Sequence, residues 1–206
     1  MLIVEGPDGS GKTTFCRELV KLLPTHIYAH FSRLPPGFDY YQGYIDRMSP
    51  NVVQDRFHIS EIIYSELRGD KSPLTLENFR LIDAKLRLIG AYTVVILPDP
   101  NDVYDRWHEG QMYDREKTTT AARLYRRGRV QSESGRWSYD LPMPDGGGVT
   151  ADVDSFIIPS KGGYPTKAMA VQVASRYVER RREVESIFGR ILGGNLQLRI
   201  GPEGGI

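Results

Sequence analysis

A segment near the start of the chain combines spaced glycines with a lysine and a threonine. Residues 6–13 read GPDGSGKT and match GxxxxGK[ST] at every fixed position, after an apolar run and before a helical pattern. In such a loop, backbone N–H groups surround a β-phosphate, Lys12 spans the β- and γ-phosphates and Thr13 offers its hydroxyl to Mg²⁺. This context disfavours an ordinary glycine-rich turn. The predicted ATP-binding residues are Gly6, Asp8, Gly9, Ser10, Gly11, Lys12, Thr13 and Thr14.

Two later segments carry side chains suited to anions and metal ions. Asp55 follows a short apolar run, where a carboxylate can orient Mg²⁺ or its waters, and Arg56 can neutralise charge on a transferring phosphoryl group. Arg33 stands before two prolines. The alternatives are a surface ion pair for Asp55 and Arg56, and a loop cap for Arg33. Within the glycine-rich loop, Asp8 must face away from a triphosphate or form an Asx turn.

Residues 102–129 are rich in arginine and predict a lid. A kinase must exclude water from the γ-phosphate, and a closing segment that carries arginine also stabilises the charge of the transition state. Most of these arginines are expected on a solvated helix face. They are Arg106, Arg115, Arg123, Arg126, Arg127 and Arg129.

Apolar periodicity predicts the elements that position these residues. Runs at 2–5, 26–31, 51–54, 92–97 and 156–158 predict strands, the second of them buried. Spacings of three and four predict helices over 13–23, 76–89, about 116–129 and about 166–188. Strands that alternate with helices predict a three-layer α/β fold, with a five-stranded parallel sheet covered on both faces.

The remaining segments predict loops within a single domain that spans residues 1–206. Prolines and a run of three glycines predict an irregular surface loop over about 135–150, and residues 201–206 are expected to form a loose tail. No internal repeat is visible.

Composition restricts the class of protein. A net charge of +1 over 206 residues argues against a general nucleic-acid coat or a polybasic membrane binder. The single cysteine, Cys16, excludes an intrachain disulfide framework and a Cys-based zinc site. With no apolar run of transmembrane length and no charged leader, we expect a soluble cytoplasmic protein.

Three segments, in order, resemble the thymidylate kinase family of nucleoside monophosphate kinases. Residues 3–14 (IVEGPDGSGKTT) are similar to that family's first strand and loop, and residues 30–37 (HFSRLPPG) to its arginine and Pro-Gly segment. Residues 53–57 (VQDRF), followed by Ser60 and Tyr64, are similar to its Asp-Arg-aromatic signature. The resemblance covers about residues 1–130 and implies a P-loop kinase fold.

This resemblance also implies roles for individual residues. Arg33 would hold the monophosphate of the acceptor, Asp8 would accept the 3′-OH of its sugar, and Tyr113 would lie near that sugar. Gly9 occupies a position that is basic in one subset of the family, so the catalytic arginine is expected from the lid, as in the other subset. The implied acceptor residues are Asp8, Arg33, Asp55, Arg56, Tyr64 and Tyr113, the catalytic ones Lys12, Arg56, Arg106 and Arg115, and the metal ligands Thr13 and Asp55.

The sequence therefore predicts an ATP- and Mg²⁺-dependent kinase that phosphorylates dTMP or a related deoxynucleoside monophosphate. Ser65 stands where the family commonly has a thymine-binding glutamine, which leaves the base open. The alternatives are a kinase of a nucleoside or of a hydroxylated base in DNA, and a P-loop ATPase or regulatory module. No stable nucleic-acid or membrane partner is expected, and the resemblance implies a homodimer.

Overall fold

The computed structural model describes residues 1–35, 37–109, 111–131, 137–142 and 148–191. Its helices are α1 (Lys12–Leu22), α2 (Tyr40–Ile45), α3 (His58–Arg68), α4 (Leu76–Leu88), α5 (Pro100–Asp105), α6 (Arg115–Arg127) and α7 (Lys167–Ile191). Its strands are β1 (Leu2–Glu5), β2 (Ile27–His30), β3 (Val52–Asp55), β4 (Tyr92–Ile96), β5 (Arg129–Gln131), β6 (Trp137–Pro142), β7 (Gly148–Asp152) and β8 (Ser155–Ile157).

Five strands form a parallel sheet in the order β2-β3-β1-β4-β8. The central strand β1 therefore lies between β3 and β4, and the chain reverses its direction of travel across the sheet at this point. Ligands of open α/β sheets bind at such a reversal, outside the carboxyl ends of the strands. The glycine-rich loop leaves β1 at this position. The predicted five-stranded parallel sheet is confirmed.

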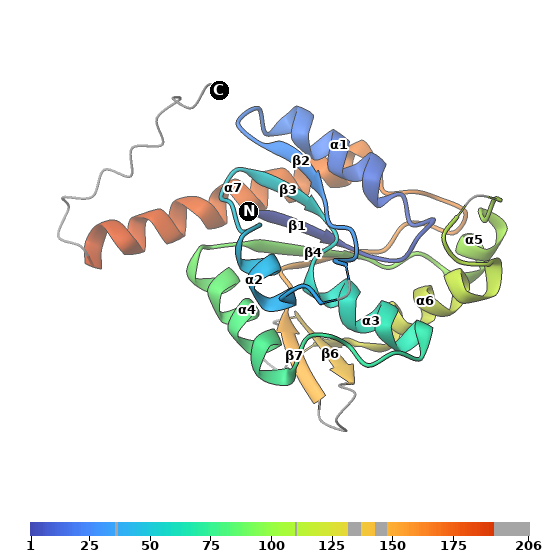
Figure 1. The fold of residues 1–206 in the computed structure, drawn as a ribbon. Coiled ribbons are helices and arrows are strands. Elements are labelled where there is room, and N and C mark those ends of the chain that lie inside the picture. Colours follow the sequence, from blue (N-terminus) through green and yellow to red (C-terminus); the bar gives the residue numbers. More distant parts are fainter. Residues whose placement is uncertain (36, 110, 132–136, 143–147, 192–206) are drawn as a thin grey trace, which may run out of the picture.

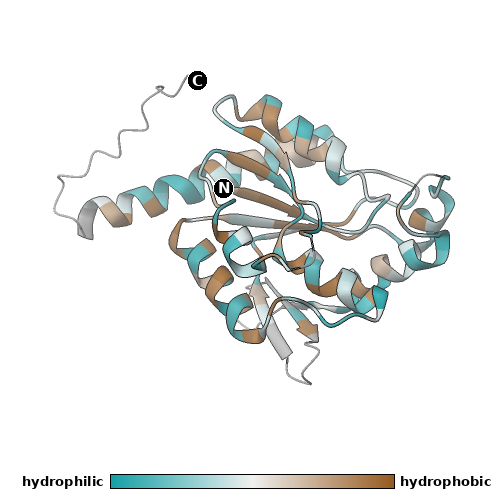
Figure 2. Cartoon of the chain, viewed as in Figure 1, coloured by the Kyte–Doolittle hydropathy of each residue, from teal (hydrophilic) through white to brown (hydrophobic). Residues whose placement is uncertain are grey.

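The two faces of the sheet are covered by different helices, as Figure 1 shows. Leu2 and Val4 of β1 pack with α1 and α7 on one face, whereas Ile3 packs on the other face with residues of α3 and α4. This division follows from the alternation of side chains along a strand. Because both faces are covered, β1 is apolar from Leu2 to Val4 and β4 from Val94 to Ile96, and Figure 2 colours the central strand brown.

The prediction of an irregular loop over about 135–150 is wrong for residues 137–142 and 148–150, which form strands. β5, β6 and β7 form a three-stranded antiparallel sheet, with Leu141 paired to Val149. Buried Leu141 and Ala151 join the hydrophobic cluster under α3 and α4, which explains why these residues form strands despite the neighbouring prolines and glycines. The predicted tail, residues 201–206, lies outside the described residues.

The second strand also differs from its expectation, because β2 is an edge strand and Ile27 is 66 % exposed. Three short or unpredicted helices, α2, α3 and α5, fill the connections. Asp39 and Asp99 are the N-cap residues that precede α2 and α5, and the side chain of each accepts a hydrogen bond from a backbone N–H of the first turn. Only Arg56 and Phe57 connect β3 to α3, so α3 begins beside the carboxyl end of the sheet.

Candidate functional site

The loop between β1 and α1 has the backbone conformation that its glycines permit. Gly9 and Gly11 have φ of 74° and 83°, and Gly6 has φ of 147°. A Cβ at Gly6 would lie 2.8 Å from the carbonyl oxygen of Ile96, so this position admits only glycine without a shift. Lys12 is buried, and its Nζ donates to the carbonyl of Pro7 at 2.9 Å, which folds the side chain over the loop.

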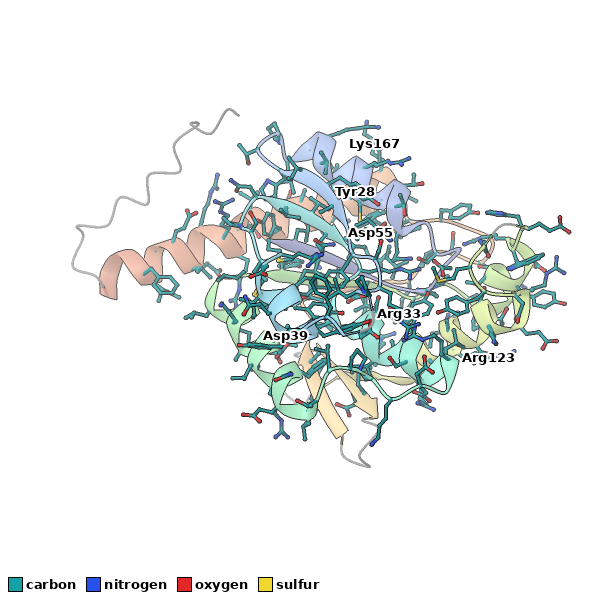
Figure 3. The ribbon with its side chains drawn as sticks, viewed as in Figure 1. Tyr28, Arg33, Asp39, Asp55, Arg123 and Lys167 are labelled. Atoms are coloured by element: carbon teal, nitrogen blue, oxygen red, sulfur yellow. The ribbon has the colours of Figure 1, made fainter. Side chains whose placement is uncertain are left out.

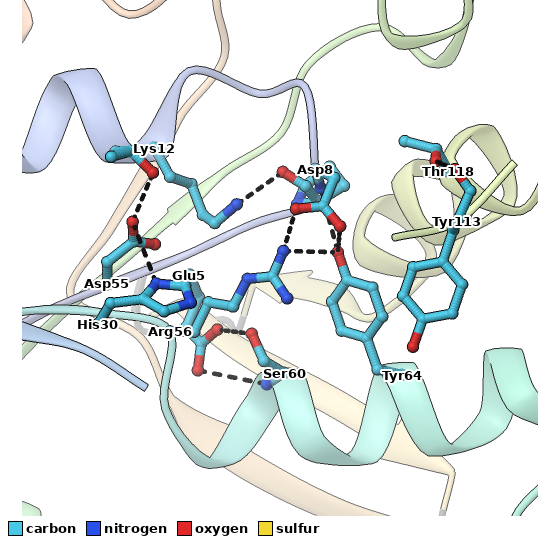
Figure 4. A network of polar contacts seen from close by, with 12 residues as sticks. Glu5, Asp8, Lys12, His30, Asp55, Arg56, Ser60, Tyr64, Tyr113 and Thr118 are labelled. Carbon is cyan, nitrogen blue, oxygen red and sulfur yellow. Dashed lines mark hydrogen bonds and ion pairs between the residues drawn. The ribbon is translucent and has the colours of Figure 1, made fainter. Parts of the chain in front are cut away.

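Thr13 and Asp55 meet where α1 begins and β3 ends. The Thr13 hydroxyl donates to Asp55 Oδ2 at 2.7 Å, and the Tyr28 hydroxyl donates to the same oxygen at 3.0 Å; Figure 3 labels Tyr28 and Asp55. His30 Nδ1 lies 3.6 Å from that oxygen (Figure 4). The other oxygen, Asp55 Oδ1, is buried and has no partner among the described residues. A buried carboxylate oxygen without a partner beside a hydroxyl fits a hard cation such as Mg²⁺.

Arg56, Asp8 and Tyr64 form a buried network beside the loop, drawn in Figure 4. Arg56 Nη2 donates to Asp8 Oδ1 and, at 3.3 Å, to the Tyr64 hydroxyl. The Tyr64 hydroxyl donates to Asp8 Oδ2 at 3.2 Å. Arg56 pairs with Asp8 and not with its neighbour Asp55, so the surface ion pair between Asp55 and Arg56 that the sequence left open does not form. The network joins the loop to α3.

The protonation of this network follows from its charges. Burial raises the pKa of Asp8, but Arg56 and Lys12 outweigh burial and bring that pKa below its ordinary value of 3.8. Burial, and then the Arg56 charge, lower the pKa of Lys12. Burial disfavours the charged form of Arg56 and by itself would lower the pKa of this side chain. The interactions with Tyr64 and Asp8 outweigh burial and raise that pKa above its ordinary value. Asp8 is therefore a carboxylate and Arg56 a guanidinium at neutral pH.

Glu5 is a functional candidate that sequence reasoning did not single out. Its carboxylate is fully buried at the end of β1, and Oε1 accepts from the backbone N–H groups of Phe57 and Ser60 at 2.9 and 3.3 Å. Oε2 accepts from the hydroxyls of Ser60 and Tyr125. Glu5 thus fixes the backbone that follows Arg56, whose φ of 70° is left-handed. Burial of a carboxylate requires such complete hydrogen bonding.

A pocket of about 260 Å³ opens next to the Arg56 network. Its walls combine aromatic rings with three arginines, which suits a ligand that has both a flat ring and a negative charge. The lining residues are His30, Phe31, Ser32, Arg33, Tyr44, Arg56, Phe57, Ser60, Glu61, Tyr64, Arg68, Met112 and Tyr113. We call this cavity the α3 pocket.

The structure places most of the predicted acceptor residues in or beside the α3 pocket. Arg33 lines it and lies 3.6 Å from Asp70, with its side chain 56 % exposed. Tyr113 stacks on Tyr64 with ring centroids 5.5 Å apart. Ser65 is buried and donates to Glu61 at 3.0 Å instead of lining the cavity.

The two candidate lid arginines have different surroundings. Arg106 Nη1 donates to the carbonyl of Gly9 at 3.3 Å and Nη2 to that of Gly163 at 2.5 Å, while its guanidinium lies 4.0 Å from the centroid of the Tyr164 ring. Arg115 is exposed and lies over Tyr104 and Trp107. The structure brings Arg106 to the glycine-rich loop and leaves Arg115 on an aromatic surface outside it.

Several other predicted residues have no contact that assigns them a role. Thr14 is exposed on the first turn of α1, and Ser10 is buried with its hydroxyl unpartnered among the described residues. Arg126 donates to the carbonyl of Pro98, and Arg127 pairs with Glu66. Within the described ranges, no set of three or more His, Cys, Asp and Glu side chains could hold a metal, and no helix there is long and apolar enough to cross a membrane.

Comparison with known proteins supports the fold. No family model and no curated protein matches the chain. Among solved structures, the chain is similar to the YorR protein of Bacillus subtilis, solved in complex with phosphorylated GDP, with a TM-score of 0.61 and 21 % identity over 88 % of this chain and 97 % of YorR. This likeness agrees with the sheet order and shows a three-layer α/β fold, with a five-stranded parallel sheet covered by helices on both faces.

Proposed function

We propose that the protein is an ATP-dependent kinase of deoxynucleoside monophosphates, similar in activity to thymidylate kinases. The observation that carries this proposal is the position of the α3 pocket, which adjoins the phosphate loop through the pair of Arg56 and Asp8. A nucleoside or water would offer no anion to the arginines that line this pocket, whereas a monophosphate would pair with the exposed Arg33 and with Nη1 of Arg56, which Asp8 does not use. The YorR structure contains phosphorylated GDP, which agrees with a nucleotide ligand for this fold.

In the proposed reaction, an oxygen of the acceptor's phosphate attacks the γ-phosphorus of ATP. The bond from that phosphorus to the β,γ-bridging oxygen breaks, which gives ADP and a deoxynucleoside diphosphate. Lys12 and the loop N–H groups would hold the donor phosphates, and Arg33 and Arg56 would orient the acceptor. Thr13 and Asp55 would hold Mg²⁺, which when bound neutralises charge on the donor phosphates.

The sugar preference follows from Asp8 and Tyr113. Asp8 would accept the 3′-OH of the acceptor, and Tyr113, stacked on Tyr64, would crowd the 2′ position. Deoxynucleotides are therefore expected to be better acceptors than ribonucleotides. Equal kcat/KM for dGMP and GMP, and for dUMP and UMP, would remove both assignments.

A coupled assay of ADP release tests the activity. It would compare dTMP, dGMP, dCMP and dAMP with their ribonucleotides, the free nucleosides, duplex DNA with hydroxymethylated bases, and no acceptor, with Lys12→Ala as the inactive control. We expect turnover that requires a monophosphate. Turnover on nucleosides or on DNA would instead support the rival kinases, and ADP release without any acceptor would support an ATPase.

Light scattering tests the expected homodimer, and fractionation tests the expected cytoplasmic location.

A further inference from the structure

One wall of the α3 pocket carries a charged pair that the proposed phosphoryl transfer does not use. Glu61 and Arg68 are seven residues apart on α3, so both project from the same side of the helix. Arg68 Nη2 lies 3.2 Å from Glu61 Oε1, and their side chains are 16 % and 7 % exposed. A buried pair of this kind contributes little net stability, because desolvation offsets the attraction. Its place on the pocket wall indicates a role toward the ligand.

The hydrogen bonds within the pair leave one acceptor and one donor free. Glu61 Oε1 accepts from Ser65 and Arg68, whereas Oε2 accepts from none of the residues that the structure describes. Arg68 donates through Nε to Asp70, through Nη2 to Glu61 and Ser65, and through Nη1 to the hydroxyl of Tyr113. A guanidinium has five N–H groups. One N–H on Nη1 therefore has no partner among the residues that the structure describes, and both side chains line the α3 pocket.

Given the proposed kinase activity, on which this inference rests, we infer that Glu61 selects guanine as the acceptor base. Guanine presents its O6 carbonyl next to two N–H donors, on N1 and N2. The free N–H of Arg68 would donate to O6, and the two lone pairs of Glu61 Oε2 would accept from N1–H and N2–H. Arg33 and Arg56 remain for the phosphate.

The other bases match this wall less well. In thymine and uracil, the single N–H lies between two carbonyl groups, so the Glu61 carboxylate would face a carbonyl oxygen. Adenine and cytosine present an amino group beside a ring nitrogen and would leave one lone pair of Glu61 without a donor. Ser65 does not line the α3 pocket, so the thymine contact implied by the resemblance has no counterpart at that position. Guanine gains at least one charge-assisted hydrogen bond over each competitor.

The test compares the wild type with Glu61→Gln on dGMP, dTMP, dCMP and dAMP, with saturating ATP. The glutamine keeps the shape of the side chain but presents N–H groups or a neutral oxygen to the base. We expect the wild type to prefer dGMP, and the variant to lose about 10- to 100-fold in kcat/KM for dGMP alone, mainly through KM. Glu66→Gln, which changes an exposed acid on the same helix, is the matched control and should leave the order of acceptors unchanged.

Calorimetric titration of dGMP and dTMP separates this inference from the proposed activity. Tighter binding of dGMP that Glu61→Gln abolishes, without turnover, would support the assignment of Glu61 and refute the kinase. Wild-type preference for dTMP, dCMP or dAMP would overturn the inference. An equal loss on all four acceptors would also overturn it, because it would show that Glu61 only supports the pocket wall.

Discussion

Replacement of Arg106 is the sharpest test of how the lid contributes to the proposed transfer. Arg106 directly follows α5, and its side chain is only 11 % exposed because it lies between the glycine-rich loop and the segment that carries Gly163 and Tyr164. Its donation to the carbonyl of Gly9 places a guanidinium beside the loop that would hold the β- and γ-phosphates. In the part of the chain that the structure describes, Arg115 contacts Tyr104 and Trp107 and makes no contact with this loop.

The expected loss follows from charge that develops only during transfer. An arginine that stabilises the equatorial oxygens in other phosphoryl transfers is worth about 10³ to 10⁵ in kcat, or about 4–7 kcal/mol. Arg106→Ala also leaves the carbonyls of Gly9 and Gly163 without this donor, at a cost of about 1–3 kcal/mol of stability each. Arg106→Lys, which keeps the charge but loses the planar fork, should fall between the wild type and the alanine variant.

Steady-state phosphorylation with saturating ATP and acceptor measures kcat. We expect kcat to fall at least 10³-fold in Arg106→Ala and less than about 3-fold in Arg115→Ala, with the exposed Arg127→Ala as the control. Urea unfolding identifies a variant that has lost activity because it has unfolded. A folded Arg106→Ala enzyme with kcat within 10-fold of the wild type would refute the assignment and leave Arg56 as the remaining candidate.

Three further predictions concern other parts of the molecule. Lys12→Ala should abolish transfer while circular dichroism stays unchanged, because Nζ serves the loop and the phosphates. Arg33→Ala should raise the KM for the acceptor more than the KM for ATP; the reverse order would move Arg33 to the donor side. Burial, the N-terminal ammonium and Arg181 lower the pKa of His26 from 6.5 to about 4. The neutral imidazole therefore stabilises the folded state fully above pH 6.5, and this contribution to the free energy of unfolding is lost as the pH falls toward 4, by about 2 kcal/mol at pH 5. In urea unfolding, the free energy of unfolding of His26→Gln should fall less between pH 7 and pH 5 than that of the wild type.

The parallel sheet and the phosphate loop could be predicted from sequence because their signals are local. Buried parallel strands are continuous apolar runs, and the loop pattern requires a strand before it and a helix after it. Predicted strand ends agree with β1, β3 and β4 to within one residue. The hairpin of β6 and β7 escaped prediction because proline and glycine at its ends resemble a loop, while Leu141 and Ala151 are buried by helices distant in sequence.

Glu5 could not be predicted for a related reason. Its partners Phe57, Ser60 and Tyr125 lie 52 to 120 residues away, and a carboxylate at the end of a strand gives no local sign that these donors surround it. Glu61 and Arg68 share one helix and have spacing that a sequence does reveal, but the free oxygen of Glu61 becomes evident only once Ser65 and Arg68 are placed. Local spacing thus identifies neighbours, and hydrogen-bond counting identifies which atoms remain for a ligand.

The pairing of Asp8 with Arg56 links the two halves of the site. Arg56 uses Nη2 for Asp8 and Tyr64, while Nη1 donates to no residue in the described part of the chain and belongs to a side chain that lines the α3 pocket. A ligand phosphate can therefore bind Nη1 without breaking the pair. Asp8 stands in the glycine-rich loop itself, so a shift of Arg56 toward an acceptor would act on the loop that is proposed to hold the donor. The left-handed backbone at Arg56, fixed by Glu5, keeps this guanidinium in place before either substrate arrives.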